Sequence, residues 1–330
     1  MTSVWPADFS RIPDEDWTHA PLDTLALKYD TVENHGWYRN LEPTLDDLAG
    51  FLRDGMRMID YSGGTGILLD RLLHRMPDAA LGCALVDSSP KFLRLALEKL
   101  GREPRVAFRL IQYLKADKRL QLLDEVLPAT LVGHVDAIAS TNAVHLYYDL
   151  GDTLRSWRRT LRAGGRAFVQ SGNIDNPDAA RGTWIIDATV GHIQGAAHAL
   201  VRDRAEYAPF RAALDDAPRM RLYDALRDKF FLPVRPLAYY LDELRGAGFA
   251  IEQVAARSIE ASVADWYEFL AAYHEGVLGW AGGSRRVDGA DPDADTIALR
   301  LRLMHDALAQ IFDGKPTFQA NWTYITSAAA

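Results

Sequence analysis

Residues 58–66 read Met-Ile-Asp-Tyr-Ser-Gly-Gly-Thr-Gly, and this stretch decides the fold. Its apolar start predicts a strand over residues 56–61, and the apolar spacing that follows predicts a helix over residues 67–75. Glycines in the turn between them permit positive φ angles and a close approach of the backbone to a ligand. The start of the helix offers unpaired N–H groups and a partial positive charge. Such a turn suits a nucleotide-like ligand.

A second acidic residue follows the next predicted strand, which covers residues 80–86. This residue is Asp87, 27 positions after Asp60, and a helix predicted over residues 90–100 follows it. In doubly wound folds an acid at this place hydrogen-bonds the hydroxyls of a ribose. The two acids and the turn therefore indicate one ligand-binding edge.

The spacing of the glycines argues against a dinucleotide-binding loop. A G-x-G-x-x-G pattern that starts at Ser62 would place Ile67 at its third glycine, and one that starts at Gly64 would place Leu69 there. The pyrophosphate-binding loop is therefore incomplete. A carboxylate at Asp60 also suits a cationic ligand, because it could pair with an ammonium group through the turn.

Short apolar runs alternate with amphipathic stretches along much of the chain, which is typical of βαβ units. Further strands are predicted at residues 106–112, 135–140, 166–170, 249–254 and 317–327, and further helices at residues 45–52, 152–161, 237–246, 263–278 and 293–312. We therefore predict an α/β fold with a doubly wound, mostly parallel seven-stranded sheet.

The predicted domain boundaries follow from the same pattern. Residues 1–50 look helical and polar, and residues 51–173 and 236–330 form the core. Residues 174–235 contain helical spacing and no convincing strand, so we predict a helical lid insertion there. A Trp- and Tyr-rich stretch within the second part of the core adds a second insertion to this lid.

Several motifs, in their order along the chain, resemble one family. Asp60–Gly66 resembles the D-x-G-x-G-x-G signature of the class I S-adenosylmethionine-dependent methyltransferases, small-molecule type. Residues 135–145 resemble that family's fourth strand and following loop, residues 157–166 its helix and glycine turn before the fifth strand, and residues 244–249 its entry to the sixth strand. The resemblance covers about residues 50–173 and 236–260. It departs from the family at Ser62, which replaces the first glycine, and at Ala163, which replaces a proline.

The resemblance implies a Rossmann-like methyltransferase fold with S-adenosyl-L-methionine as cofactor. It implies in-line methyl transfer to an O, N or C atom of a small molecule in a closed, aromatic-lined pocket. The implied cofactor-binding residues are Tyr29, Asp60, Ser62, Gly63, Gly64, Gly66, Asp87, Ser88 and Asn142. Asp117 is the candidate for the contact to the adenine amine after the third strand, and Gln112 is its rival.

His145 is the candidate general base, because it follows the fourth strand at the edge where open α/β sheets bind ligands. The alternative is a packed or capping histidine. The candidate substrate-binding residues are Tyr148, Asn173, Trp184 and Trp266, and the alternative for the aromatic ones is core packing. The two histidines at positions 192 and 198 lie six residues apart, which does not place them on one helical face, so we expect no metal.

Composition limits the partners. The 330 residues are 48% hydrophobic and carry a net charge of −8, which is typical of a globular protein and disfavours nucleic acid. The single cysteine, Cys83, excludes a disulfide framework. The first residues lack a signal-peptide pattern and no stretch approaches the ~18 apolar residues of a membrane span, so we expect a cytoplasmic location and no membrane partner. The expected partner is a small acceptor, apolar or aromatic, and a homodimer is left open.

Two other classes of function stay open on the sequence alone. A non-catalytic binding or scaffolding protein would explain Ser62, and a nicotinamide oxidoreductase would share the strand–turn–helix unit but would need the missing third glycine. Methylation of nucleic-acid bases is disfavoured by the acidic charge. The chain also has Asn142-Ala143-Val144-His145 where the base-methylating enzymes carry Asn/Asp-Pro-Pro-Tyr/Phe.

Overall fold

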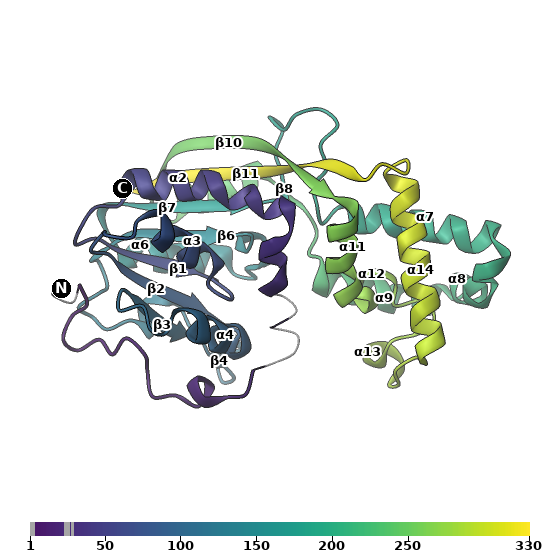
Figure 1. Ribbon diagram of the computed structural model, residues 1–330, viewed down its shortest axis with the longest axis horizontal. Helices are drawn as coiled ribbons and strands as arrows, with labels where there is room; N and C mark the ends of the chain where they lie inside the picture. The colour runs from purple at the N-terminus through teal and green to yellow at the C-terminus, as the bar shows by residue number, and fades with distance from the viewer. Residues whose placement is uncertain (1–3, 23–26, 28–29) are drawn as a thin grey trace.

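The computed structural model describes residues 4–22, 27 and 30–330, and it shows a layered sheet domain joined to a body of helices (Figure 1). The sheet has seven strands in the order β10-β11-β7-β6-β1-β2-β3. Their bounds are β1 Arg57–Tyr61, β2 Gly82–Asp87, β3 Val106–Leu110, β6 Val135–Thr141, β7 Leu161–Ser171, β10 Phe249–Ser262 and β11 Thr317–Ala329. Strands β7 to β3 pair in parallel, and β11 pairs antiparallel with β7 and β10. This confirms the predicted mostly parallel, seven-stranded sheet.

Helices cover both faces of the sheet. One face packs against α2 (Glu42–Phe51), α3 (Ile67–Arg75) and α4 (Pro90–Leu100), and the other packs against α6 (Leu150–Thr160) and α10 (Leu237–Gly246). Strand β2 buries every residue, which explains its uninterrupted apolar sequence. Because β1, β2, β6 and β7 run in parallel, the turns that follow them all lie at one edge, the carboxyl edge of the sheet.

A second unit, which we call the helical body, is built from two segments far apart in the chain. Its helices are α7 Thr189–Asp203, α8 Arg211–Leu214, α9 Ala217–Phe230, α11 Val263–Ala272, α12 His274–Leu278, α13 Arg285–Asp288 and α14 Ala294–Ile311. The Trp266 indole donates to Thr189 Oγ1 at 3.0 Å, and Arg219 pairs with Asp288 at 2.8 Å, so the two segments are joined by polar contacts as well as by packing. The predicted boundaries group residues 263–311 with the core, whereas their helices pack against the insertion.

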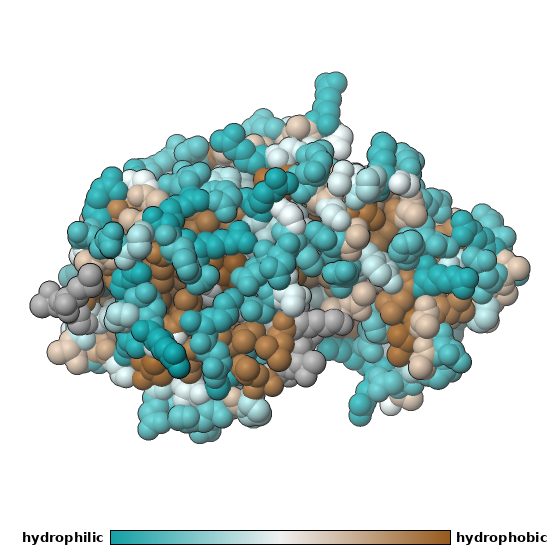
Figure 2. Space-filling model, viewed as in Figure 1, coloured by the Kyte–Doolittle hydropathy of each residue, from teal (hydrophilic) through white to brown (hydrophobic). Residues whose placement is uncertain are grey.

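The face of the molecule that is visible in Figure 2 is mainly hydrophilic. Apolar residues gather in patches on the lower side of the sheet domain and over part of the helical body. Within the described ranges, no helix is both long and apolar enough to cross a membrane.

The chain before α2, which was predicted to be helical, contains short helical pieces in its described part. In the described ranges it forms short 3-10 helices at Asp16–His19, Thr31–Asn34 and Gly36–Leu41. Prolines at positions 6, 13 and 21 interrupt helical structure, because proline lacks the backbone N–H that an α-helix needs. The Arg11 guanidinium instead donates to the carbonyls of Gly101 and Glu103, and this ties the segment to the sheet domain.

Several predicted elements beyond the core have different bounds. Strand β10 continues to Ser262, where we predicted residue 254, because it pairs with β11 along nearly its whole length and carries the chain to the helical body. The helix predicted over residues 263–278 is broken at Tyr273, which leaves the helical conformation at ψ 22°. Residues 174–235, predicted to lack strands, begin and end with the short parallel pair β8 Ile174–Asp175 and β9 Arg235–Pro236.

Candidate functional site

The turn after β1 has the backbone conformation that its glycines allow. The φ angles are +59° at Ser62, +56° at Gly64 and +85° at Gly66, the residue that precedes α3. A Cβ atom at Gly66 would lie 2.8 Å from a methyl carbon of Leu100, so this position requires glycine twice over. Ser62, where the resembling family has glycine, holds a left-handed conformation that side chains rarely adopt.

Asp60 lies beneath this turn as a buried acid with no cationic partner among the described residues. Its side chain is fully buried, and neither carboxylate oxygen has a hydrogen-bond partner among the described residues. A Cβ atom at Gly63 would lie 2.6 Å from Asp60 Oδ2, so the turn passes directly over the carboxylate. Burial, and secondarily the nearby Asp87, raise the pKa of Asp60 to about 8. A cationic group beside Asp60 would stabilise its charged form.

Asp87 joins the end of β2 to the same turn. Its Oδ2 atom accepts the N–H of Gly64 at 2.8 Å, and Oδ1 accepts the N–H of Ser89 at 2.7 Å. Burial raises the pKa of Asp87, and these backbone N–H groups act in the opposite direction. Ser88 is exposed beside it. Asp60, the glycines and Asp87 are therefore brought together as predicted.

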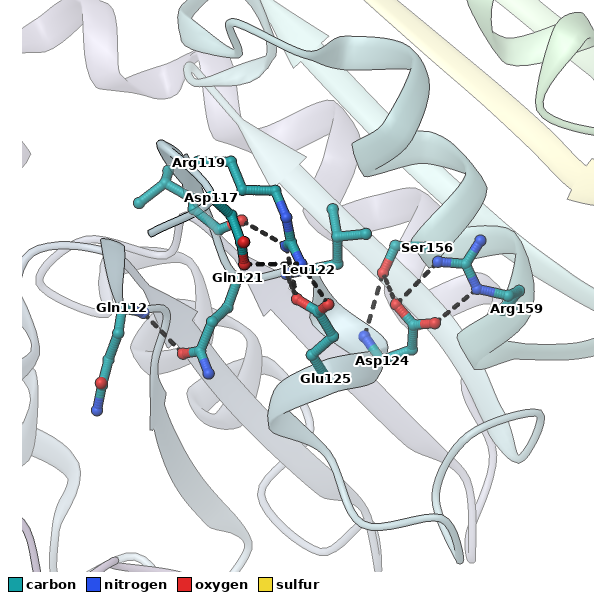
Figure 3. A network of polar contacts seen from close by, with 10 residues as sticks. Gln112, Asp117, Arg119, Gln121, Leu122, Asp124, Glu125, Ser156 and Arg159 are labelled. Atoms are coloured by element: carbon teal, nitrogen blue, oxygen red, sulfur yellow. Dashed lines mark hydrogen bonds and ion pairs between the residues drawn. The ribbon is translucent and has the colours of Figure 1, made fainter. Parts of the chain in front are cut away.

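The candidates after the third strand lie on a surface hairpin. Strands β4 (Tyr113–Leu114) and β5 (Arg119–Leu120) form it, and Asp117 is an exposed residue of its turn (Figure 3). The Asp117 carboxylate lies 4.0 Å from Arg119, which itself binds Glu125 at 2.7 Å. Gln112 is also exposed, and its backbone N–H donates to the Gln121 side chain. Neither candidate is joined to the glycine turn by a contact in the described ranges.

Tyr147 connects the glycine turn to the loop after β6 by hydrogen bonds. It was not among the predicted site residues. Its phenol donates to Ser62 Oγ at 3.0 Å and is hydrogen-bonded to Ser140 Oγ at 2.8 Å. Burial raises the pKa of Tyr147, so the phenol keeps the proton that this contact needs. The ring also packs edge-on against Tyr61, with centroids 5.5 Å apart. The hydrogen bond to the Ser62 hydroxyl thus stabilises a left-handed conformation that glycine adopts more readily.

Replacing Tyr147 with phenylalanine removes this bond and leaves two serine hydroxyls without a partner. We expect the free energy of unfolding to fall by about 1.5 kcal/mol, as measured by urea titration. The neighbouring Tyr148 is 81% exposed, and Tyr148→Phe should change stability by less than about 0.5 kcal/mol. Equal stability of the two variants would contradict the proposed tie.

His145 lies in η4 (Val144–Leu146), directly after β6, and its ring is almost fully buried. Nδ1 is 2.9 Å from Ser171 Oγ, and Nε2 is 3.5 Å from Asp187 Oδ2. Burial lowers the pKa of His145 to about 4 and raises the pKa of Asp187 to about 7. Asp187, in the turn before α7, was not predicted, and nothing in its local sequence marks it.

Two of the predicted site residues, Asn142 and Asn173, lie just after β6 and β7. Asn142 has φ +55°, and its side-chain oxygen accepts from Asn40 at 3.2 Å and from the Trp322 indole at 2.9 Å. Asn173 is buried, donates its backbone N–H to Ser171 Oγ at 3.0 Å, and has a side-chain oxygen without a partner in the described ranges. Both therefore lie near His145, which follows β6 and contacts Ser171 at the end of β7.

The other predicted acceptor residues are dispersed. Trp266 is 1% exposed, and its indole is satisfied by Thr189, so in this structure it packs the interior of the helical body. Trp184 packs against His192 and Phe312 and forms a bridge to β11, and Tyr148 is exposed on the surface. In the described ranges no hydrogen bond or ring contact joins Trp184, Trp266, Tyr148 and Asn173 to one another. The prediction for Tyr29 falls outside the described residues.

The described residues contain no group of three or more His, Cys, Asp or Glu side chains that could hold a metal ion. His192 and His198 each contact a tryptophan ring instead, Trp184 and Trp280 respectively.

Comparison with known proteins gives a consistent result. The profile of a family described as a methyltransferase domain matches residues 59–167. Among curated proteins, the ubiquinone/menaquinone biosynthesis C-methyltransferase UbiE of Shewanella sediminis is 27% identical over 157 residues, which is 47% of this chain and 58% of the relative. The corresponding protein of Shewanella woodyi is 28% identical over the same shares. The chain thus spans little more than half the length of these relatives.

The chain is also similar to solved structures at low sequence identity. Phosphoethanolamine N-methyltransferase 2 of Haemonchus contortus, in complex with S-adenosyl-L-methionine, is 14% identical with a TM-score of 0.48, covering 92% of this chain and 56% of that one. The YcgJ protein of Bacillus subtilis is 15% identical with a TM-score of 0.49, covering 88% and 98%.

Proposed function

Since the chain carries a class I S-adenosylmethionine-dependent methyltransferase domain, we propose that it transfers a methyl group from S-adenosylmethionine to a small molecule. The observation that carries this proposal is the buried, unpartnered Asp60 carboxylate beneath a glycine turn that is also bonded to Asp87. A cationic nucleoside is the ligand that would use both acids at once.

Three features fit this cofactor. An ammonium group would compensate Asp60, whose two oxygens lack partners among the described residues. The absence of a side chain at Gly63 lets the backbone pass close to that carboxylate, because a Cβ atom there would lie 2.6 Å from Asp60 Oδ2. Asp87 uses three of its roughly four acceptor positions on the backbone groups of Gly64, Ser88 and Ser89, so one stays available for a ribose hydroxyl.

We assign the binding roles accordingly. Asp60 would hold the ammonium group, the turn from Ser62 to Gly66 would follow the cofactor backbone, and Asp87 would hold the ribose. When bound, S-adenosylmethionine supplies an electrophilic methyl carbon on sulfur together with a good leaving group. The protein's part is to orient the acceptor toward that carbon and to exclude water.

We place the acceptor at the ends of β6 and β7, between His145 and the helical body. Aromatic rings support an apolar or aromatic acceptor there: Trp37 stacks on Trp322 with centroids 6.0 Å apart, and Trp322 in turn donates to Asn142. The curated relatives are named for quinone biosynthesis, which agrees with an aromatic acceptor. We further propose that the helical body, residues 174–235 together with 263–311, is the lid over this site.

Methyl transfer itself is tested with isotope-labelled S-adenosylmethionine and a panel of hydroxyquinones, phenols and amines. We expect label in at least one small product, together with one equivalent of S-adenosylhomocysteine per methyl group transferred. Cofactor binding without transfer to any panel member would instead favour the non-catalytic binding module.

A further inference from the structure

A three-residue cluster, formed by Ser171, His145 and Asp187, lies where β7, the loop after β6 and the segment before α7 meet. Ser171 is fully buried, and the His145 and Asp187 side chains are 11% and 18% exposed. These residues are 26 and 16 positions apart in the chain, so only the fold brings them together. The cluster lies at the carboxyl edge of the sheet, beside the proposed cofactor site.

The hydrogen bonds of the cluster accommodate one direction of proton donation. Ser171 Oγ accepts the backbone N–H of Asn173 at 3.0 Å, and we assign its own hydroxyl proton to His145 Nδ1 at 2.9 Å. The proton of the neutral imidazole then belongs on Nε2, which faces Asp187 Oδ2 at 3.5 Å. Each ring nitrogen of His145 therefore faces a side chain of the protein, Ser171 at Nδ1 and Asp187 at Nε2.

We propose that Asp187 is the residue that removes the acceptor's proton, and that His145 and Ser171 are positioning residues that hold its carboxylate. The second oxygen of Asp187 has no partner in the described part of the chain, and its side chain is the most exposed of the three. This inference rests on the proposed function of the same site. It also restricts the acceptor to a hydroxyl or an amine, because a base is needed only where the nucleophile holds its proton at neutral pH.

The protonation of the pair agrees with this assignment. At 3.5 Å their contact favours the charged forms, whereas burial favours the neutral form of each, and burial dominates. Burial holds the pKa of Asp187 at about 7 and that of His145 at about 4, and no other charged side chain of the described residues adds to either shift. Near neutral pH the cluster therefore gains or loses one proton, and it does so on Asp187.

The reaction balances with an acceptor that is a hydroxyl or an amine. The oxygen or nitrogen forms a bond to the methyl carbon, the carbon–sulfur bond breaks, and sulfur keeps the electron pair. The proton that the acceptor loses passes to the Asp187 carboxylate. His145 stays neutral, and its Nε2 atom faces the Asp187 carboxylate throughout.

The protonation scheme is tested on the full chain, without an acceptor, by nuclear magnetic resonance of isotope-labelled histidine between about pH 5 and 9. His145 is assigned with a His145→Gln variant. We expect a neutral ring protonated on Nε2, whose nitrogen shifts move with a midpoint near pH 7, and we expect that movement to disappear in Asp187→Asn. A ring that itself becomes protonated near pH 6, a ring protonated on Nδ1, or a transition that persists in Asp187→Asn would overturn the proposal.

The catalytic role is tested with whichever panel acceptor is methylated. Asp187→Asn should lower kcat at least 100-fold, Asp187→Glu should restore part of it, and both variants should bind S-adenosylhomocysteine within about twofold of the unmodified chain. Transfer to carbon acceptors alone, or full activity of Asp187→Asn, would contradict the assignment. Failure of the unmodified chain to bind S-adenosylhomocysteine would instead count against the proposed function, and the histidine spectra distinguish the two cases.

Discussion

Replacing Asp87 with alanine is expected to weaken the binding of S-adenosylhomocysteine about 100-fold. The variant loses the acceptor of a ribose hydroxyl, and a hydrogen bond to a charged group contributes roughly 1.5–3 kcal/mol. It also releases the Gly64 N–H, which the Asp87 carboxylate now holds at 2.8 Å, so the turn loses one of its anchors. Isothermal titration calorimetry measures the affinity directly.

The matched control for this experiment is Asp242→Ala. Asp242 is a surface residue of α10, 75% exposed and paired with Arg245, so its loss should leave the affinity unchanged. If Asp87→Ala binds S-adenosylhomocysteine as tightly as the control, the ribose is held elsewhere and the role assigned to Asp87 is wrong.

Replacing Asp60 with asparagine is expected to stabilise the cofactor-free protein and to weaken cofactor binding. The pKa of Asp60 is raised from 3.8 to about 8, so the folded state binds more protons than the unfolded state between these pH values. The stability that the protonated group provides is therefore complete below about pH 4 and is lost as the pH rises through about 8. A shift of this size corresponds to roughly 6 kcal/mol as an upper limit.

Urea unfolding at several pH values tests this prediction. Above about pH 8 Asp60→Asn should be more stable than the unmodified chain by several kcal/mol, and the difference should vanish near pH 4. The same variant should bind S-adenosylhomocysteine about 10-fold more weakly, because it has lost the charge that pairs with the ammonium group. If the free energy of unfolding changes with pH in the same way for both proteins, Asp60 is not an uncompensated buried acid.

The parts of the site that the sequence predicted are local in the chain. Asp60, Gly64 and Gly66 belong to one strand–turn–helix unit, and Asp87 ends the adjacent strand, so apolar periodicity and glycine positions were enough to find them. His145 could be predicted for the same reason, because it directly follows β6. The strands of the core were found because they are buried on both faces and therefore nearly continuously apolar.

The parts that could not be predicted depend on tertiary contacts. Asp187 reaches His145 only because the segment before α7 folds back over the ends of β6 and β7. The bond from Tyr147 to Ser62 requires that β6 pair with β1, which no local pattern specifies. Helical structure was predicted for the polar first residues, but polar spacing alone could not specify the short 3-10 helices that their described part forms.

The central claim is that the turn after β1 binds S-adenosylmethionine. Calorimetric titration of the full chain with S-adenosylmethionine, S-adenosylhomocysteine and NAD tests it most directly. We expect saturable binding of one equivalent of S-adenosylmethionine or of S-adenosylhomocysteine, and no binding of NAD. Binding of NAD alone, or of none of the three, would contradict it.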